Sequence, residues 1–305
     1  MLTMLFLSAT ACAKGSQESH RTSPIVSDTS LEERREQILE WAVTCHYGDY
    51  SYPCEDRPAH KQDEKDDHSM MMAGYVCASG QPGMHEATRA MIAEDGQMFR
   101  SVRQRYEGRG DRADNLSRDM AVGALLCWAV TKDQDSLWRT YRYIREHGNK
   151  LCDDDSDGRC LMTPVLWRSY EIAFKHAGLS VPPTMKRNAG GSDALYAQVV
   201  LFNTPKGYRT LLNATQLHLH DYVGRGTKNL DRAKEFIRKR ERLNPYFEYL
   251  ARGKTDKAKR LVLEQCPTER PEYADEWTWG QDQDKQKWKE SIGWDCVFMI
   301  NLLLG

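Results

Sequence analysis

Two pairs of polar residues at predicted helix starts carry the side chains that cleavage of a glycosidic bond requires. Asp67 and His68 precede one apolar segment, and Arg118 and Asp119 begin another. Hydrolysis uses two carboxyl groups, one of them as an acid. Elimination uses a base, often His or Tyr, and a cation that neutralises a uronate carboxylate. We predict Asp67 and Asp119 as the catalytic carboxyl pair. His68 and Arg118 would bind the substrate, Arg118 through an anionic group. The alternative is helix capping, because negative charge is favoured at a helix N-terminus.

A third candidate group follows the spacing of one helical face. His218 lies three and four residues before Asp221 and Tyr222, so the three side chains share a face if the segment is helical. A His–Asp–Tyr face suits proton transfer. We predict His218 as an auxiliary catalytic base and Asp221 and Tyr222 as substrate-binding residues. The alternative is a half-buried structural histidine.

Two tryptophans in a predicted loop form a fourth group. Trp277 and Trp279 follow the acids Asp275 and Glu276. Exposed indole rings beside an acid are suited to stacking on sugar faces, so we predict that both rings bind substrate. The alternative is that the loop fills the core with its rings.

An acidic run has the spacing of a calcium loop. Asp153, Asp155 and Asp157 precede Gly158 in a D-x-D-x-D-G pattern. Position 164 is Pro, so the bidentate Glu of an EF-hand is missing. Structural calcium at these three carboxylates is therefore one prediction, and an acidic hairpin closed by a disulfide is the other. We predict no other cofactor.

The N-terminus has features of an export signal. Residues 1–12 are apolar, then small, and end at Cys12, as in bacterial lipoproteins whose cysteine is lipidated. A basic n-region is missing, and Ala9 stands where Leu is usual. The alternatives are a start further upstream, a plain secretory signal, or an apolar N-terminus of a cytosolic protein. We predict an exported protein anchored at the membrane through Cys12, with residues 13–29 as a flexible tether.

The cysteine count supports export. Without Cys12, eight of the 9 cysteines remain, and an even set in an exported chain indicates disulfides. Eight cysteines allow 105 pairings. Short loops favour two of the bonds, and the remaining cysteines supply the other two. The predicted set is Cys45–Cys54, Cys152–Cys160, Cys77–Cys127 and Cys266–Cys296. The alternative is reduced, buried thiols.

Composition excludes several classes of protein. The 305 residues contain 43 basic and 44 acidic side chains, with a net charge of −1, which argues against a nucleic-acid-coating protein. No apolar run approaches the roughly 20 residues of a membrane-spanning helix. The chain has no P-loop, G-x-S-x-G or dinucleotide fingerprint. We expect no nucleic-acid partner, and membrane attachment only through the lipid.

Helical periodicity runs through nearly all of residues 30–305, which we predict to form a single all-α domain without a convincing strand. Capping residues mark several helix starts: Ser30, Thr163–Pro164, Thr204–Pro205 and Asn244–Pro245. Serial helices favour stacked hairpins in an α/α toroid, one hairpin of which is missing or abbreviated. The inner helices would be the apolar segments near 66–78, 117–130, 163–177 and 192–203. An open solenoid or irregular bundle is the alternative.

Short segments resemble parts of α/α-toroid carbohydrate-active enzymes. Residues 66–72 are similar to their aspartate-led helix starts, and residues 95–101 and 117–120 are similar to a loop and the helix start that follows it. Gly293–Trp294–Asp295 adds an aromatic and acidic element. The broader pattern also resembles uncharacterised bacterial and phage proteins. This resemblance implies saccharide handling on a toroid.

These observations predict an exported, lipid-anchored carbohydrate-active enzyme that cleaves a glycosidic bond by hydrolysis or elimination in a central cleft. The predicted partner is a polysaccharide or oligosaccharide. The alternative is a non-catalytic surface lipoprotein that binds a glycan or a protein.

Overall fold

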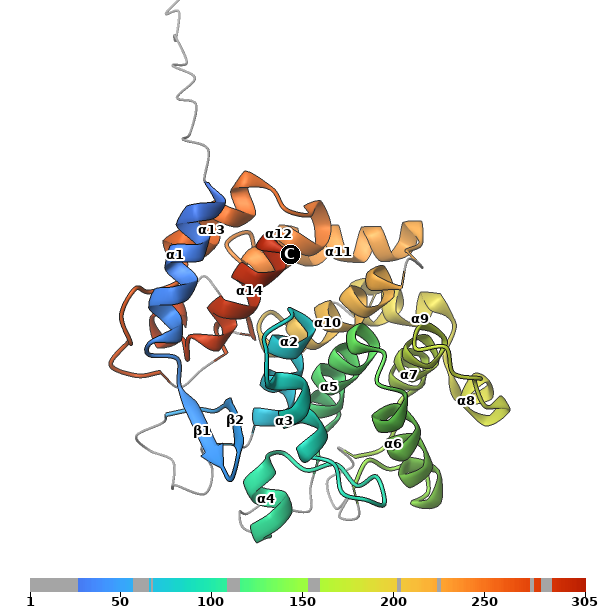
Figure 1. The fold of residues 1–305 in the computed structure, drawn as a ribbon. Helices are drawn as coiled ribbons and strands as arrows, with labels where there is room; N and C mark the ends of the chain where they lie inside the picture. Colours follow the sequence, from blue (N-terminus) through green and yellow to red (C-terminus); the bar gives the residue numbers. More distant parts are fainter. Residues whose placement is uncertain are drawn as a thin grey trace, which may run out of the picture.

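The computed structural model describes residues 27–56, 66, 68–108, 116–152, 160–201, 204–223, 226–274, 277–280 and 287–305. Within these ranges the chain is mostly helical (Figure 1), which is consistent with the predicted all-α class. The elements follow in this order: α1 (Asp28–Leu39), β1 (Thr44–Tyr47), β2 (Tyr50–Pro53), α2 (Ser69–Ala78), α3 (Met84–Ala90), α4 (Val102–Glu107), α5 (Arg118–Thr131), α6 (Gln134–Glu146), α7 (Pro164–His176), α8 (Pro183–Asn188), α9 (Ser192–Tyr196), η2 (Ala197–Leu201), α10 (Tyr208–Tyr222), α11 (Lys228–Arg240), α12 (Pro245–Arg252), α13 (Asp256–Gln265), η3 (Thr278–Gly280), η5 (Lys287–Glu290) and α14 (Trp294–Leu304).

A small antiparallel hairpin corrects the expectation that the chain has no strand. β1 pairs with β2 around a two-residue turn, with Tyr47 opposite Tyr50. Gly48 has a φ of 55°, which glycine adopts without the steric cost of a side chain. Each strand has four residues, too few to show alternation clearly. The hairpin places Tyr50 beside α3 and delivers Glu55 to the start of α2.

Two of the four predicted helix caps are correct, because a cap acts on neighbouring residues. Thr163 accepts a hydrogen bond from the N–H of Leu166, and Asn244 accepts one from the N–H of Tyr246. Two starts are wrong. Ser27, not Ser30, caps α1. Thr204 does not start a helix: its hydroxyl donates to the carbonyl of Gln198 at 2.7 Å. α10 begins four residues later, at Tyr208.

Two central helices, α2 and α5, lie in backbone contact and run in the same direction. Gly74 and Gly123 face each other, and a Cβ built on Gly74 would lie 2.3 Å from the carbonyl carbon of Gly123. One turn further along both helices, Cys77 and Cys127 form a disulfide. Nearly every side chain of α2 and α5 is buried, as expected for helices that are apolar all round.

Other helices share this direction. On α10, Tyr208 donates a hydrogen bond to Met71, and Thr215 donates to the hydroxyl of Tyr75, so α10 follows α2 from start to end. On α14, Phe298 stacks near Tyr75, and Asn301 donates to the hydroxyl of Ser79, so α14 does the same. The N-terminal ends of α2, α5 and α10 therefore meet at one end of the core (Figure 1).

The four predicted disulfides are confirmed. Bonds join Cys45 to Cys54, Cys77 to Cys127, Cys152 to Cys160, and Cys266 to Cys296. Two close short loops, and the other two tie elements distant in sequence. Among the described helices, none combines the length and apolarity needed to cross a membrane.

Candidate active site

The starts of α2, α5 and α10 bring four side chains with acid–base chemistry to one place. His68 is the residue before α2, Asp119 lies in the first turn of α5, and Tyr208 is the first residue of α10. Glu55 comes from the segment after β2. The sequence pointed to His68 and Asp119, and the structure brings both to the same helix ends.

Glu55 and His68 form a carboxylate–imidazole pair. Nδ1 of His68 lies 2.8 Å from Oε1 of Glu55. Glu55 is only 3% exposed, whereas His68 is 27% exposed. The buried carboxylate therefore orients the imidazole and favours the tautomer that carries its proton on Nδ1. Because Nδ1 faces Glu55, Nε2 is the ring nitrogen of His68 that could act as a base.

Tyr208 lies between these groups. Its ring meets the ring of His68 edge-on, with 6.2 Å between the ring centroids. Burial raises the pKa of the Tyr208 hydroxyl well above its usual value, and the charges of Asp119 and Glu55 raise it further, while Arg100 lowers it. Tyr208 is therefore protonated at neutral pH. Its hydroxyl donates to the thioether of Met71 at 3.1 Å, a weak acceptor.

Asp119 also acts on the deeper Tyr75. The pKa of Tyr75 is raised by burial and, more weakly, by Asp119, while a hydrogen bond from Thr215 lowers it. Asp119 thus lies at the boundary between a buried pair of tyrosines and an open cleft. In this position the carboxylate of Asp119 can contact a bound ligand, and its charge raises the pKa of the Tyr75 and Tyr208 hydroxyls.

The cleft beside Asp119 has a volume of about 520 Å³, within the roughly 300–1,000 Å³ typical of small-molecule sites. Arg118 and Arg209 supply positive charge along it, and Gln216 has a buried Oε1 without a hydrogen-bond partner among the described residues. The walls are otherwise polar and aliphatic: Val122, Thr163, Leu166, Gln198, Thr204, Pro205, Leu212 and Asn213. Such a lining suits a polar, anionic ligand.

A buried ion pair holds the start of α2 in position. Asp66 is 1% exposed and accepts hydrogen bonds from Nη2 and Nε of Arg103, at 2.8 and 3.1 Å. The hydroxyl of Ser101 donates to the same carboxylate at 2.7 Å. Both carboxylate oxygens of Asp66 therefore accept hydrogen bonds, and these bonds hold the turn that precedes α2 in place.

His218, Asp221 and Tyr222 do share a face, as predicted, but their cavity is separate from the cleft. They line a volume of about 340 Å³ with Tyr249. His218 is two residues from Gln216, which places the two side chains about 200° apart around α10. Burial lowers the pKa of His218 to about 4, and its Nδ1 lies 3.0 Å from the hydroxyl of Tyr246. His218 therefore does not join Asp119.

Asp221 is held by a lysine in that second cavity. Oδ2 of Asp221 lies 2.7 Å from Nζ of Lys234. Burial raises the pKa of Asp221, and the bond to Lys234 opposes this. Tyr222 is 44% exposed, and its ring meets His176 edge-on. Asp221 and Tyr222 line this cavity and do not line the cleft beside Asp119.

The predicted sugar-stacking tryptophans belong to the core, which corrects that expectation. Trp277 is 1% exposed and packs against Tyr75 and Phe298. Trp279 is fully buried, and its indole N–H donates to the carbonyl of Asp295 at 2.7 Å. Neither ring can offer a face to a ligand, because its faces are covered by other side chains.

Several predicted residues lie outside the described ranges: Cys12, Asp67 and the acidic run Asp153, Asp155 and Asp157. Among the residues that the structure does describe, no group of three His, Cys, Asp or Glu side chains is arranged to hold a metal ion.

Glu55 and Tyr208 are the site residues that the sequence prediction missed. Tyr208 begins a helix, the criterion that selected Asp119, but the start of that helix was predicted at Thr204–Pro205. Glu55 has no local signal, since it reaches the site only because the hairpin folds against α2.

The fold and the site together define a disulfide-bonded, mostly helical protein with a polar cleft at the shared ends of its central helices. The chain matches no protein-family model, no curated protein and no solved structure.

Proposed function

We propose that this protein is an exported carbohydrate-active enzyme that cleaves a glycosidic bond in the cleft beside Asp119. The observation that carries the proposal is the convergence of Asp119, Tyr208 and the Glu55–His68 pair at one end of three helices that run in the same direction. The adjoining cleft, with Arg118 and Arg209, has the size and charge for an anionic saccharide.

An incomplete α/α toroid is the arrangement that we propose for the fold. The shared direction of α2, α5, α10 and α14 supports it, since inner helices of a toroid run in one direction and open at one end. α2, α5 and α7 correspond to three of the predicted inner helices. α10, rather than the segment 192–203, would be the next one.

Elimination is the chemistry that these side chains support best. His68, oriented by Glu55, would take the proton from the carbon next to a uronate carboxylate. Arg118 would neutralise that carboxylate as negative charge develops. The carbon–oxygen bond to the leaving sugar then breaks, a carbon–carbon double bond forms, and Tyr208 gives its proton to the leaving oxygen. The raised pKa of Tyr208 keeps it protonated for this step.

Hydrolysis is the second candidate, supported by the carboxylates Asp119 and Glu55, whose charges both act on Tyr208. Glu55 is poorly suited to attack a sugar or activate water, because it is 3% exposed and bonded to His68. Binding without catalysis is the third candidate, and it predicts saturable binding with no product.

Export and lipid anchoring through Cys12 complete the proposal. Four disulfides support an oxidising compartment, because such bonds are rare in the cytosol.

The test incubates the protein with uronate polysaccharides (polygalacturonate, alginate, hyaluronan) and with neutral xylan, and follows reducing ends and the ultraviolet absorbance of unsaturated products. We expect both signals to rise together on a uronate substrate. Reducing ends without absorbance would indicate hydrolysis, and saturable binding without either signal would indicate a binding protein. If the protein neither binds nor cleaves any of them, the proposed function is wrong.

Variants of the site residues test whether the measured turnover depends on this site. His68→Gln should abolish turnover, and Tyr208→Phe should lower it by about 10²–10⁴-fold, the range for loss of an acid–base group. Both should leave the melting temperature within a few degrees. Tyr222→Phe, on the exposed part of the same helix as Tyr208, is the matched control and should leave turnover unchanged. An active His68→Gln protein would exclude the assigned site.

A further inference from the structure

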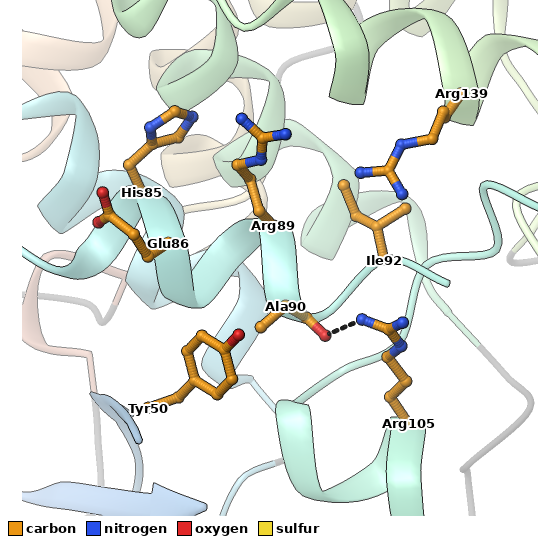
Figure 2. Close-up of a pocket in the computed structure, with 8 residues that line it drawn as sticks. All are labelled: Tyr50, His85, Glu86, Arg89, Ala90, Ile92, Arg105 and Arg139. Atoms are coloured by element: carbon orange, nitrogen blue, oxygen red, sulfur yellow. Dashed lines mark hydrogen bonds between the residues drawn. The ribbon is translucent and has the colours of Figure 1, made fainter. Parts of the chain in front are cut away.

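A third cavity, separate from the cleft and from the cavity at His218, is lined by arginines from three helices. Arg89 of α3, Arg105 of α4 and Arg139 of α6 line it (Figure 2). Its volume is about 440 Å³, and Tyr50, from β2, stands below it in this view. None of these residues lines the cleft beside Asp119.

Backbone carbonyls and a shared acid hold the guanidinium groups in place. Nη1 of Arg105 donates to the carbonyl of Ala90 at 2.8 Å, and Nη1 of Arg139 donates to that of Ala93 at 3.3 Å. Arg89 and Arg139 both contact the same oxygen of Asp135, at 3.2 and 3.0 Å, so their guanidinium groups are close together. A site whose donors are already positioned loses less entropy when it binds a ligand.

The acids around the cavity leave this charge accessible. Asp135 is 56% exposed, and an exposed ion pair is weak enough for a bound anion to compete with it. Asp133 is buried and occupied, because it accepts hydrogen bonds from Ser136 and His85, at 2.7 and 2.8 Å. Its carboxylate also lies 3.8 Å from Nε of Arg89 and so offsets part of the charge of that arginine, but not that of Arg105 or Arg139. Glu86 is the acid that lines the cavity itself.

We propose that this cavity binds a tetrahedral oxyanion, the sulfate or phosphate group of a small molecule. One arginine fork is enough for a planar carboxylate. Three guanidinium groups from separate helices can donate hydrogen bonds to an oxyanion whose oxygens point in several directions. The hydroxyl of Tyr50 adds a neutral donor from the hairpin. The site is independent of the proposed enzymatic activity.

The test is isothermal titration of the whole protein with inorganic phosphate and inorganic sulfate at constant ionic strength, with acetate as the monovalent planar control. We expect saturable binding of phosphate or sulfate and much weaker binding of acetate. Arg105→Gln and Arg139→Gln should each weaken binding about tenfold, the effect of losing one charge-assisted hydrogen bond. Arg142→Gln, an exposed arginine on the same helix as Arg139, should leave binding unchanged.

Glu86→Gln provides a second test that removes no arginine. Its side chain is exposed, so the fold should tolerate the change, and the loss of a negative charge should tighten binding severalfold. Glucose 6-phosphate and glucose 6-sulfate separate the two sources of the group. Tighter binding than the free ion identifies an ester on a larger molecule, and equal binding identifies the free ion. Binding that is unchanged in both arginine variants and in Glu86→Gln, or that acetate matches, would overturn the proposal.

Discussion

Gly74→Ala is expected to force α2 and α5 apart. The new Cβ would lie 2.3 Å from the carbonyl carbon and 2.6 Å from the next backbone nitrogen of the facing helix, at Gly123 and Ala124. Backbone atoms cannot turn aside as a flexible side chain can, so the helices must separate. The disulfide between Cys77 and Cys127, one turn away, opposes this movement.

The magnitude follows from two opposing effects. Overpacking a core costs about 1–3 kcal/mol, and contact with backbone places this site at the upper end, near 3 kcal/mol. Replacing a mid-helix glycine by alanine contributes about 1 kcal/mol in the other direction. The free energy of unfolding should therefore fall by about 2 kcal/mol, which lowers the melting temperature by about 4–8 °C in a domain of this size.

The assay is urea and thermal unfolding of Gly74→Ala and of Gly191→Ala. Gly191 has no neighbour within 4 Å of a built Cβ and no positive φ, so its variant should stay within about 0.5 kcal/mol of the parent. The cleft groups offer a second readout, because α2 presents His68 and α5 presents Asp119. A Gly74→Ala protein as stable as the parent, or more stable, would refute the close backbone contact.

Two further predictions test burial. Between pH 6.5 and 4 the unfolded state binds more protons at His218 than the folded state does, because the folded pKa is about 4 against a usual 6.5. Stability should thus fall as the pH falls through this window, by up to about 3 kcal/mol. His218→Gln should lack that component in urea unfolding at pH 7 and pH 4, and an unchanged pH dependence would contradict the assignment. Trp277→Ala should lower the free energy of unfolding by about 3–5 kcal/mol, as for a core aromatic residue. A stable Trp277→Ala protein with weakened saccharide binding would instead restore the stacking role.

Local sequence was enough where neighbouring residues decide the structure. Thr163 and Asn244 cap their helices through hydrogen bonds to backbone groups two or three residues away, so both starts were predictable. The hairpin was not predictable in the same way, since its four-residue strands are stabilised by pairing with each other and by packing on α2 and α3.

The disulfides show which pairings the local sequence predicts and which depend on the packing of the helices. Cys45–Cys54 and Cys152–Cys160 close short loops, which chain geometry favours. Cys77 and Cys127 are 50 residues apart, and the short loops alone leave four cysteines with three possible pairings, so the sequence did not fix this bond. In the structure the same bond follows from the packing of α2 on α5, with two glycines at their contact.

The sequence by itself determined the helical class, two of the four helix caps and the side chains suited to acid–base chemistry, because periodicity and capping act over a few residues. Only the tertiary structure decided which of these side chains meet. Tyr208 reaches Met71 and His68 across about 140 positions of the chain, through the packing of α10 on α2. On that same helix, His218 and Gln216 are only two residues apart, yet they point about 200° away from each other and line different cavities. Side chains that are neighbours in sequence therefore separate into different cavities, while distant ones form the site.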